Sequence, residues 1–397
     1  MRLRNFLALL TALTLLGAPA LAHTREEVRA EYAKISDWTQ GEPYLSQPVL
    51  RAPYAAGALR PEALSDALDL LNFYRWLAGL DEVALDAALT DLAQYGATLT
   101  AVNGVVSHDP SAPTDMDAAF ADKARYAAGT CNLAALNWFG EDVLREGLTS
   151  FVRDDGEENL AALGHRRWVL NPGMAYTGFG LANDDTGMSY VAMYAHDLQG
   201  DPGAWEYVAW PAAGAFPAEL MQAELAWSIV LNPEIYDATD AWVRLTDLQS
   251  GAVYEFPGDG GYFAVDDGGY GAGPCLIFRP EVGRDYEQNQ IWRVEAGAAS
   301  GPDIVFEVEM ISLYPVEPAS VEMYPREAQV RAGETLALSA AVVPDWADDL
   351  SISWSSSDES VATVANGLVT ALRAGSCEIV ATAVNGKQDV CRLSVVE

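Results

Sequence analysis

The spacing of apolar residues changes once along this chain, and that change limits the folds it can adopt. Between residues 61 and 163, apolar side chains recur every three to four residues, which is typical of amphipathic helices. After Pro172 they alternate with polar residues, in short runs separated by glycine, proline and aspartate. Helices first and strands afterwards predict an α+β domain followed by all-β domains.

Four segments carry the helical spacing. The first begins at Pro61, a residue favoured in the first helical turn. The others are LDAALTDLAQYGATLT from Leu85, a segment opened by a capping-box pattern at Thr114, and GEDVLREGLTSFVRD from Gly140. Strand-like alternation follows in AYTGFGLA and MSYVAMYA. We therefore expect residues 61–200 to form one layered domain of helices and strands.

Two further units are expected after this domain. Residues 201–313 contain strand-like runs such as AELAWSIVL and QIWRVEA, and they predict an all-β sandwich of roughly seven strands. Residues 314–397 start with a proline-containing linker and continue in short strands with Asn-Gly turns at 366–367 and 385–386. This pattern predicts a second, smaller sandwich.

The cysteines of the last unit can be placed by their distance from a turn. The whole chain has four cysteines, which permit disulfides without defining a disulfide scaffold. A two-residue turn at 385–386 would pair Cys377 with Ser394 and leave Cys377 and Cys391 on the inward face. A disulfide between them needs an irregular hairpin, so a disulfide and two buried thiols both stay open.

Residues 1–22 have the layout of a secretory signal peptide. Arg2 and Arg4 precede an apolar stretch, and an A-x-A cleavage pattern occupies residues 20–22. The mature chain is expected to start with a lead segment, residues 23–60. No later apolar run is long enough to span a bilayer. We expect an exported product that is released or attached by non-covalent contacts, outside the cell or at its surface.

The charge of the chain excludes some partners. It has 23 basic and 57 acidic residues, which gives a formal net charge of −34. Such a chain repels phosphate backbones and anionic lipids, so nucleic acids are not expected partners. Half of the residues are apolar, which indicates a folded protein rather than an acidic disordered one.

Two parts of the chain resemble known families. The ordered motifs N-x-x-R-x-x-x-G-L, L-x-x-x-L-x-x-x-A, S-H and G-H-R in residues 61–200 resemble the CAP superfamily (cysteine-rich secretory, antigen 5 and pathogenesis-related 1 proteins) in its bacterial secreted form. The run WSSSDESVATVANGLVTA in the last unit resembles a bacterial Ig-like domain of group 2. The first resemblance implies an α-β-α sandwich, and the second implies an extracellular spacer or adhesion module.

The CAP resemblance also implies a site. The family has a large cleft in which two histidines and two acidic residues can bind a divalent metal. These positions fall on His108, His165 and Asp154, and the fourth falls on Cys131, where the family has glutamate. The implied cofactor is zinc or calcium, with a Cys131 thiolate as a further zinc ligand if it is not oxidised. The alternative is that the histidines are hydrogen-bonded cleft residues that hold no metal.

The acidic run DDGEEN needs cations nearby. Arg166 or Arg167 is therefore expected to pair with this loop, residues 154–158, which includes Asp155 and Glu158. These four residues are predicted to support the wall of the cleft rather than to react.

Three other features receive structural interpretations. Trp168 is predicted to be buried behind the cleft wall. His196 follows a predicted strand, and we expect it at the surface or at a domain boundary with no assigned role. The run DDGG at residues 266–269 is interpreted as a loop, without the residue order of a calcium-binding loop.

These features favour a secreted or surface-associated protein that binds a small apolar ligand or a protein partner in the CAP cleft, displayed on β-sandwich modules. One alternative is a divalent-metal-dependent hydrolase that uses His108, His165 and Asp154. Another is an extracellular adhesion or matrix protein, with protein or glycan partners, in which the CAP domain is a non-catalytic scaffold. No compact catalytic motif favours an enzyme, so binding is the leading expectation.

Overall fold

The computed structural model describes residues 22–397 except residue 40 and residues 138–141. Residues 1–21 of the predicted signal peptide lie outside the described residues, as do the first two residues of the predicted fourth helix, 140 and 141.

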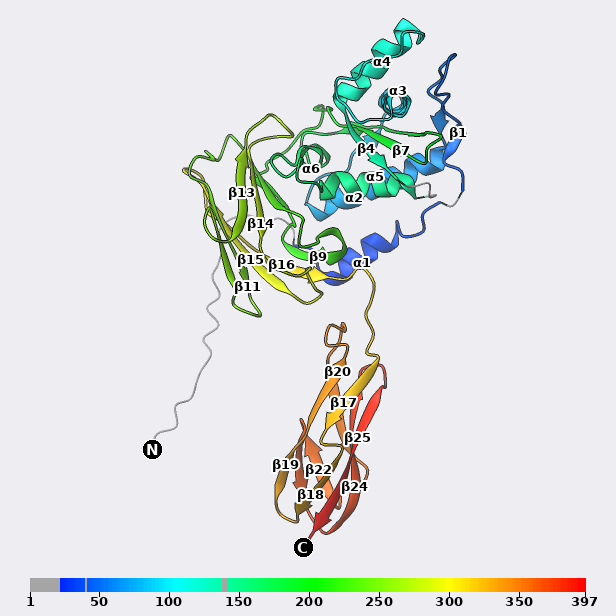
Figure 1. Cartoon of the computed structure of the whole chain (residues 1–397). Helices are drawn as coiled ribbons and strands as arrows, with labels where there is room; N and C mark the ends of the chain where they lie inside the picture. Colours follow the sequence, from blue (N-terminus) through cyan, green and yellow to red (C-terminus); the bar gives the residue numbers. More distant parts are fainter. Residues whose placement is uncertain (1–21, 40, 138–141) are drawn as a thin grey trace.

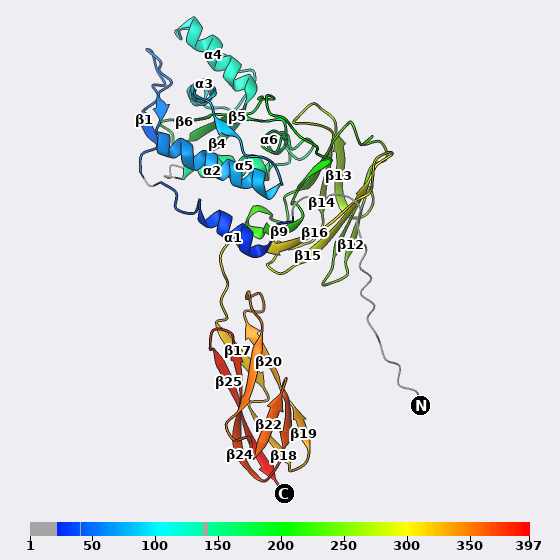
Figure 2. The same cartoon turned by 180° about the vertical axis from the view of Figure 1, so that it is seen from behind.

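The N-terminal unit has three layers (Figure 1). Its elements are α1 (Arg25–Ala33), β1 (Tyr44–Ser46), β2 (Ala58–Leu59), α2 (Pro61–Leu77), β3 (Ala84–Leu85), α3 (Ala87–Asn103), α4 (Ala118–Thr130), β4 (Cys131–Leu136), α5 (Val143–Arg153), α6 (Gly164–Val169), β5 (Tyr176–Thr177), β6 (Phe179–Asn183) and β7 (Ser189–Tyr194). An antiparallel sheet of order β4-β7-β6 lies in the middle. Helices α3 and α4 cover one face, and α2, α5 and α6 lie on the other side (Figures 1 and 2). The predicted α-β-α sandwich is confirmed.

The helical spacing predicted α2 to α5, although α3, α4 and α5 begin at Ala87, Ala118 and Val143, a few residues later than predicted. Helix α4 begins at Ala118 rather than near Thr114, because the side chain of Asp117 accepts hydrogen bonds from the N–H groups of Ala119 and Phe120. Helix α6, the GHRRWV segment, is too short to show a period and was not predicted.

Helix α3 packs unusually close to the sheet because the residues between them are small. A Cβ atom added to Gly180 would lie 2.3 Å from the carbonyl oxygen of Ala93, and one added to Gly178 would lie 2.1 Å from the nitrogen of Thr90. Most of the other buried residues here are alanines. This contact fixes the position of the sheet relative to α3 and α4.

The middle unit is a two-sheet β-sandwich. Its strands are β8 (Tyr207–Trp210), β9 (Gly214–Pro217), β10 (Trp227–Leu231), β11 (Trp242–Asp247), β12 (Val253–Phe256), β13 (Gly261–Asp266), β14 (Cys275–Pro280), β15 (Ile291–Gly297) and β16 (Ile304–Ile311). The sheets have the orders β13-β14-β10-β8 and β12-β11-β15-β16-β9. The sandwich is confirmed, but this fully described stretch has nine strands rather than about seven. Strands β8, β9 and β13 were missed.

The N-terminal layers and the middle sandwich share one hydrophobic core. Its buried residues run from Leu71 and Phe151 in the helices to Trp210 and Phe216 in the sandwich. Tyr74 of α2 meets Trp210 edge to face, with ring centroids 6.2 Å apart. Loops of the sandwich are therefore held against the helices and can form part of a site on them.

The C-terminal unit is a separate sandwich with its own core (Figure 1). Its strands are β17 (Ser320–Tyr324), β18 (Glu327–Arg331), β19 (Thr335–Ala337), β20 (Ser339–Val343), β21 (Ile352–Ser356), β22 (Ala362–Ala365), β23 (Leu368–Ala371), β24 (Gly375–Ala383) and β25 (Gln388–Val396). They form groups of order β17-β20, β18-β25-β24-β21 and β19-β23-β22.

The predicted register of the β24–β25 hairpin is wrong by one residue. Cys377 pairs with Leu393, because the loop has three residues, 384–386, with Gly386 at a φ of 84°. Cys377 and Cys391 are both buried, and all four cysteines of the chain are free. The structure therefore has the two buried thiols rather than the disulfide.

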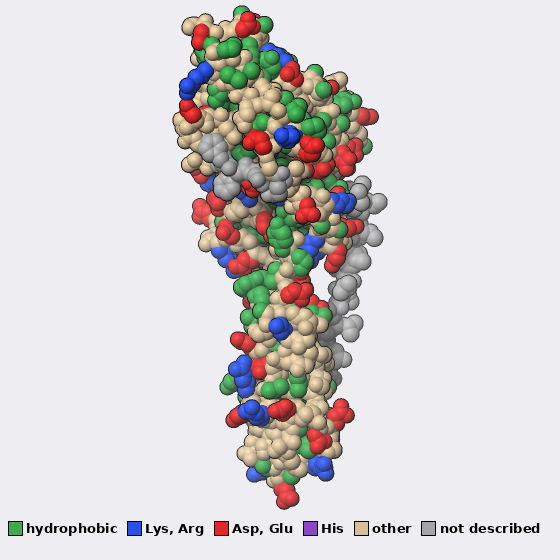
Figure 3. All heavy atoms as spheres, turned by 90° about the vertical axis from the view of Figure 1, so that its right-hand side faces the viewer, with side chains coloured by type: hydrophobic (Ala, Val, Ile, Leu, Met, Phe, Trp, Pro, Cys, Tyr) green, Lys and Arg blue, Asp and Glu red, His purple; other side chains and the backbone are tan. Residues whose placement is uncertain are grey.

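The surface is acidic and the described helices do not cross a membrane. On the face shown in Figure 3, acidic side chains are spread over the upper units and the C-terminal sandwich, among fewer basic ones. In the described part of the chain, no helix has both the length and the apolar composition that a bilayer crossing requires.

Candidate functional site

A pocket of ≈ 500 Å³ lies where the helices of the N-terminal unit meet a loop of the middle sandwich. It brings together three of the four histidines of the chain, His108, His165 and His196. The other lining residues are Gly129, Cys131, Asn132, Glu158, Asn159, Ala162, Gly164, Trp168, Gly268, Gly269 and Tyr270. His108 and His165, 57 residues apart in sequence, thus line one cavity, here called the cleft.

Asp154 orients His165 from below the cleft. It follows the last residue of α5 with a φ of 49°, and none of its side chain is exposed to solvent. One carboxylate oxygen accepts a hydrogen bond from His165 Nδ1 at 2.8 Å, and the other accepts from the N–H of Arg166 at 3.2 Å. Because Nδ1 carries the proton, Nε2 of neutral His165 has a lone pair available to a ligand. Asp154 is not among the residues that line the cleft, and its carboxylate is occupied by these two hydrogen bonds, so its role as a metal ligand stays a prediction.

His108 is held in the same tautomer. Its Nδ1 donates to the carbonyl oxygen of Ala128 in the last turn of α4, at 2.7 Å. A carbonyl oxygen only accepts, so Nε2 of neutral His108 is also left with a lone pair. This matches the expectation of a hydrogen-bonded cleft histidine.

His196, for which no role was predicted, also lines the cleft. Its ring packs against Trp168, with centroids 4.4 Å apart. Burial, and to a smaller extent the charge of His108, lower the pKa of His196 below its usual value. Its imidazole is therefore neutral at pH 7. Trp168 itself is only partly buried and lines the cleft, which corrects the prediction that it lies behind the wall.

Cys131 lines the cleft as a neutral thiol. It is the first residue of β4 and is 3 % exposed. Burial raises the pKa of this thiol far above its ordinary value. Without a bound metal, Cys131 is therefore a protonated thiol and a poor nucleophile at neutral pH.

The residues of the cleft do not fit the zinc or calcium ion that the family resemblance implies. Among the described residues, no group of three or more His, Cys, Asp and Glu side chains is placed to hold a metal ion. The carboxylate of Asp154 already accepts hydrogen bonds from His165 Nδ1 and from the N–H of Arg166. Zinc sites use at least three protein donors, and calcium prefers six to eight oxygen ligands.

Arg166 supports the cleft through carbonyl oxygens. Its guanidinium donates to the carbonyls of Val152 and Arg153, both at 2.6 Å, and crosses to the sandwich to reach the carbonyl of Ala226 at 2.7 Å. Burial lowers the pKa of Arg166 to about 10, which still leaves it charged at pH 7. The predicted ion pair between its side chain and the acidic loop is wrong, because the guanidinium is buried between α5 and the sandwich.

Arg167 clamps the loop that joins β13 to β14. Its guanidinium forms an ion pair with Asp266 at the start of this loop and donates to the carbonyl of Gly273 near its end, at 2.8 Å. A third hydrogen bond reaches the carbonyl of Ala162 at 3.1 Å. The side chain of Arg167 is only 1 % exposed. Arg167 therefore also supports the cleft, but through this loop rather than through the predicted acidic run.

The clamped loop supplies cleft residues that the sequence analysis missed, above all Tyr270. A Cβ atom added to Gly164 would lie 2.9 Å from the ring of Tyr270, so the ring rests directly on the start of α6. The guanidinium of Arg167 lies 5.6 Å from the ring centroid. The DDGG run identified a loop, but no local signal connects it with histidines in another unit.

The acidic run has other partners than the two arginines. Glu157 pairs with Arg279 of the sandwich at 2.9 Å. Glu158 lines the cleft, whereas Asp155 is exposed and its carbonyl oxygen accepts a hydrogen bond from Asn159 at 2.8 Å. Glu158 is thus a cleft residue rather than a salt-bridge support.

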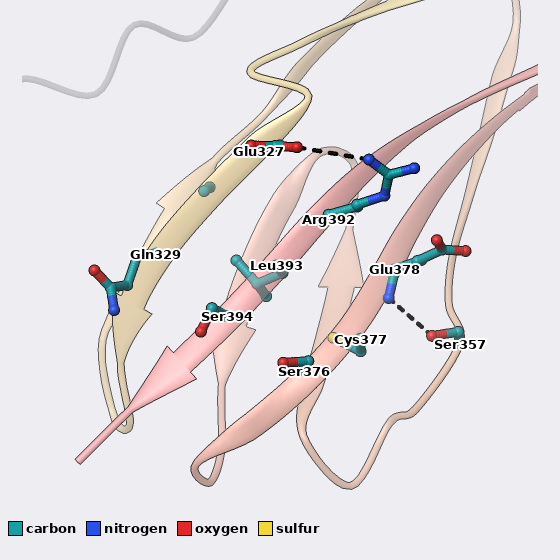
Figure 4. Close-up of a pocket in the computed structure, with 10 residues that line it drawn as sticks. Glu327, Gln329, Ser357, Ser376, Cys377, Glu378, Arg392, Leu393 and Ser394 are labelled. Carbon is teal, nitrogen blue, oxygen red and sulfur yellow. Dashed lines mark hydrogen bonds and ion pairs between the residues drawn. The ribbon is translucent and has the colours of Figure 1, made fainter.

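A second pocket, of ≈ 730 Å³, lies on the C-terminal sandwich (Figure 4). It is an open depression over β18, β25 and β24, where Ser376 and Ser394 are shorter than their neighbours. Its cation, Arg392, is 3.5 Å from Glu327, and Ser357 accepts a hydrogen bond from the N–H of Glu378 at 2.8 Å. No aromatic or imidazole side chain lines it.

The solved structures that resemble this chain include distant ones. Domains 4 and 5 of the S-layer protein SbsC match at 16 % identity over 27 % of this chain and 65 % of that chain, with a TM-score of 0.19. A pair of tandem Ig domains of titin matches at 14 % identity over 43 % of this chain and 87 % of that chain, with a TM-score of 0.25. At these TM-scores the likeness carries no conclusion about this chain.

One curated protein matches a short part of the sequence. It is a 3-O-alpha-D-galactosyl-alpha-L-arabinofuranosidase of Bifidobacterium longum subsp. longum, 48 % identical over 59 residues. These residues are 15 % of this chain, and the match spans about one twentieth of the length of that protein.

Two family models match longer parts of the chain. Residues 68–194 match the cysteine-rich secretory protein family, CAP, and residues 318–392 match the bacterial Ig-like domain of group 2. The first range covers the α-β-α sandwich from within α2 to the end of β7, and the second covers most of the C-terminal sandwich. The chain therefore contains a CAP domain of the cysteine-rich secretory protein family and a C-terminal bacterial Ig-like domain of group 2.

Proposed function

We propose that this protein is exported and binds a small ligand in the cleft between its CAP domain and its middle sandwich, with the Ig-like domain as a display module. The observation that carries the proposal is the set of side chains around the cleft. Three imidazoles, Trp168 and Tyr270 converge on one pocket whose volume lies in the ~300–1,000 Å³ range of small-molecule sites.

The lining modifies the expectation of a purely apolar ligand. Asn159, Glu158 and the three histidines all face the cleft. A ligand without hydrogen-bonding groups would bury these polar atoms without partners, at a cost of about 1–3 kcal/mol each. The ligand class that fits has both an apolar face and several polar groups.

Thermal melts of the full chain test this proposal. The probes are an amphiphilic set (myristate and cholesterol), a set of neutral sugars, and the ions Zn²⁺ and Ca²⁺. A probe that binds at a hundred times its dissociation constant should raise the free energy of unfolding by about 2.7 kcal/mol. The shift should be lost in the variant His108→Ala/His165→Ala and kept in Arg284→Ala, a matched change at an exposed arginine outside the cleft. A shift that survives the double change, or no shift with any probe, would overturn the proposal.

Hydrolysis is the second candidate function, favoured by the hydrogen bond between Asp154 and His165. A buried carboxylate that holds Nδ1–H and leaves Nε2 free is the arrangement of a histidine general base. In such a reaction Nε2 would take the proton of a water molecule that attacks the ligand.

A turnover assay with any probe that binds in the thermal melts distinguishes hydrolysis from binding alone. A hydrolase that works in this way should lose turnover in His165→Ala but keep it after treatment with EDTA, because the cleft residues do not fit a metal. Binding without turnover in the wild type would leave the protein a binder, and loss of turnover on chelation would contradict the metal-free general base.

A further inference from the structure

One wall of the cleft comes from the middle sandwich. The loop between β13 and β14 contributes Gly268, Gly269 and Tyr270 to the lining, opposite residues of the CAP domain. Arg167 holds both ends of this loop through Asp266 and the carbonyl of Gly273. A residue carried on a clamped loop keeps its position before a ligand arrives, which lowers the entropic cost of binding.

The ring of Tyr270 is the exposed flat surface of this wall. Tyr270 is 41 % exposed, although its ring rests on Gly164. A tyrosine that is fixed in place and still open to solvent can stack on the apolar face of a ring-shaped ligand. Trp168, packed against His196, offers a second aromatic surface in the same cavity.

The polar groups of the cleft suit hydroxyl groups. The Nε2 atoms of His108 and His165 are left for hydrogen bonds with a ligand because Nδ1 of each ring is already bonded, and Asn159 and Glu158 add further polar atoms from another segment. A polyhydroxylated ring, whose hydroxyl groups point outward in several directions and both donate and accept, satisfies such a lining.

The charges of the cleft disfavour ionic ligands. Its lining holds no lysine or arginine and one carboxylate, Glu158, so an anion finds no fixed counter-charge. An organic cation would compete with Arg167, whose guanidinium already lies 5.6 Å from the centroid of the Tyr270 ring. A neutral ligand needs no counter-charge and does not compete with Arg167.

From these observations we infer that the ligand is a neutral saccharide of one or two rings, stacked on Tyr270 and hydrogen-bonded by the cleft histidines. The inference rests on the proposed binding function and adds the chemical class of the ligand and the residue that selects it. Tyr270 acts here on the ligand itself, and Arg167 acts as a positioning residue through the loop.

Titration of the full chain, followed by intrinsic tryptophan fluorescence and calorimetry, tests the inference. The probes are N-acetylglucosamine and its dimer, galactose and arabinose, with glucuronate and glucosamine as charged counterparts and myristate as an amphiphile with a long apolar chain. We expect saturable binding of at least one neutral sugar and at least tenfold weaker binding of its charged counterparts.

Two variants test the role of the ring. Tyr270→Ala should weaken sugar binding at least tenfold, as expected when an aromatic anchor is truncated, whereas Tyr270→Phe keeps the ring and should stay within about threefold of the wild type. The matched control is Tyr324→Ala, which removes an exposed tyrosine from the Ig-like domain. Unfolding curves of each variant separate weakened binding from loss of fold.

The outcomes distinguish this inference from the function on which it rests. Binding of myristate or a charged sugar without binding of any neutral sugar would overturn the saccharide assignment and leave the binding function standing. Neutral sugar binding unchanged in Tyr270→Ala would overturn the stacking role. If no probe of any class binds, both the ligand class and the proposed function fail.

Discussion

At the residue scale, Asp154 is a buried carboxylate whose two oxygens each accept a hydrogen bond next to the cation of Arg166. Asp154→Asn removes the charge and replaces one acceptor with a donor that faces His165 Nδ1–H. We expect the free energy of unfolding to fall by about 1–3 kcal/mol, since buried polar groups lose their partners. Urea denaturation measures this. The neighbouring Asp155 is exposed, and Asp155→Asn should leave stability unchanged; equal effects of the two changes would contradict the buried role of Asp154.

His196 makes stability depend on pH in a defined window. Its folded pKa lies below the ordinary value of 6.5, so the unfolded chain takes up a proton at a higher pH than the folded protein does. The free energy of unfolding should therefore fall as the pH is lowered through 6.5 towards the folded pKa. Chemical denaturation between pH 7.5 and pH 5 measures this slope. His196→Gln should flatten it, and an unchanged slope in the variant would show that His196 is not the group that titrates.

The sequence predicted some cleft residues and missed others for a physical reason. His108 and His165 were found because each lies in a short motif, and Cys131 was found as a departure from one. Tyr270 enters the cleft through a contact between units that are about a hundred residues apart, which leaves no mark in its own neighbourhood. The partners of Arg166 were likewise missed. Every residue has a backbone carbonyl oxygen, so the sequence does not indicate which carbonyl of the sandwich accepts this hydrogen bond.

At the element scale, β6 packs closely against α3 because Gly180 has no side chain. Gly180→Ala would put a Cβ atom 2.3 Å from the carbonyl oxygen of Ala93, and backbone cannot move aside cheaply. We expect a loss of about 1–3 kcal/mol of stability, as for other overpacked cores. Gly173→Ala is the control, because the nearest atom to its added Cβ would lie 3.5 Å away. A thermal melt compares the two, and equal Tm values would show that β6 can withdraw from α3.

Elements defined by local pattern were predicted best. The periods of α2, α3 and α5 are visible within each segment, and the alternation of β15 and β16 is equally local. Strand β9 has only four residues and owes its structure to parallel pairing with β16, almost a hundred positions later. The register of the β24–β25 hairpin was predicted wrongly although it is set locally. A single extra loop residue shifts every pair of the hairpin.

At the scale of the whole molecule, helix α1 ties the CAP side of the chain to the Ig-like domain. Arg29 forms two hydrogen bonds with Asp348 of that domain, at 2.6 and 2.9 Å, and Arg25 forms a third at 3.1 Å. Gln288 of the sandwich donates to the same carboxylate at 2.5 Å. Helix α1 of the lead segment thus forms a brace, a second connection to the Ig-like domain in addition to the linker (Figure 2).

Asp348→Ala should release this brace without disturbing either fold. We expect small-angle X-ray scattering to report a broader distribution of distances, because the linker at residues 314–318 would be left to set the orientation of the Ig-like domain. Asp345→Ala, at an exposed aspartate in the same loop, should scatter like the wild type. Burial alone would raise the pKa of Asp348, but the hydrogen bonds from Arg29 and from the Val316 N–H hold it below 3.8, so the wild-type contact should persist at pH 5. Identical scattering of Asp348→Ala and the wild type would mean that the linker and the remaining contacts fix the orientation without this carboxylate.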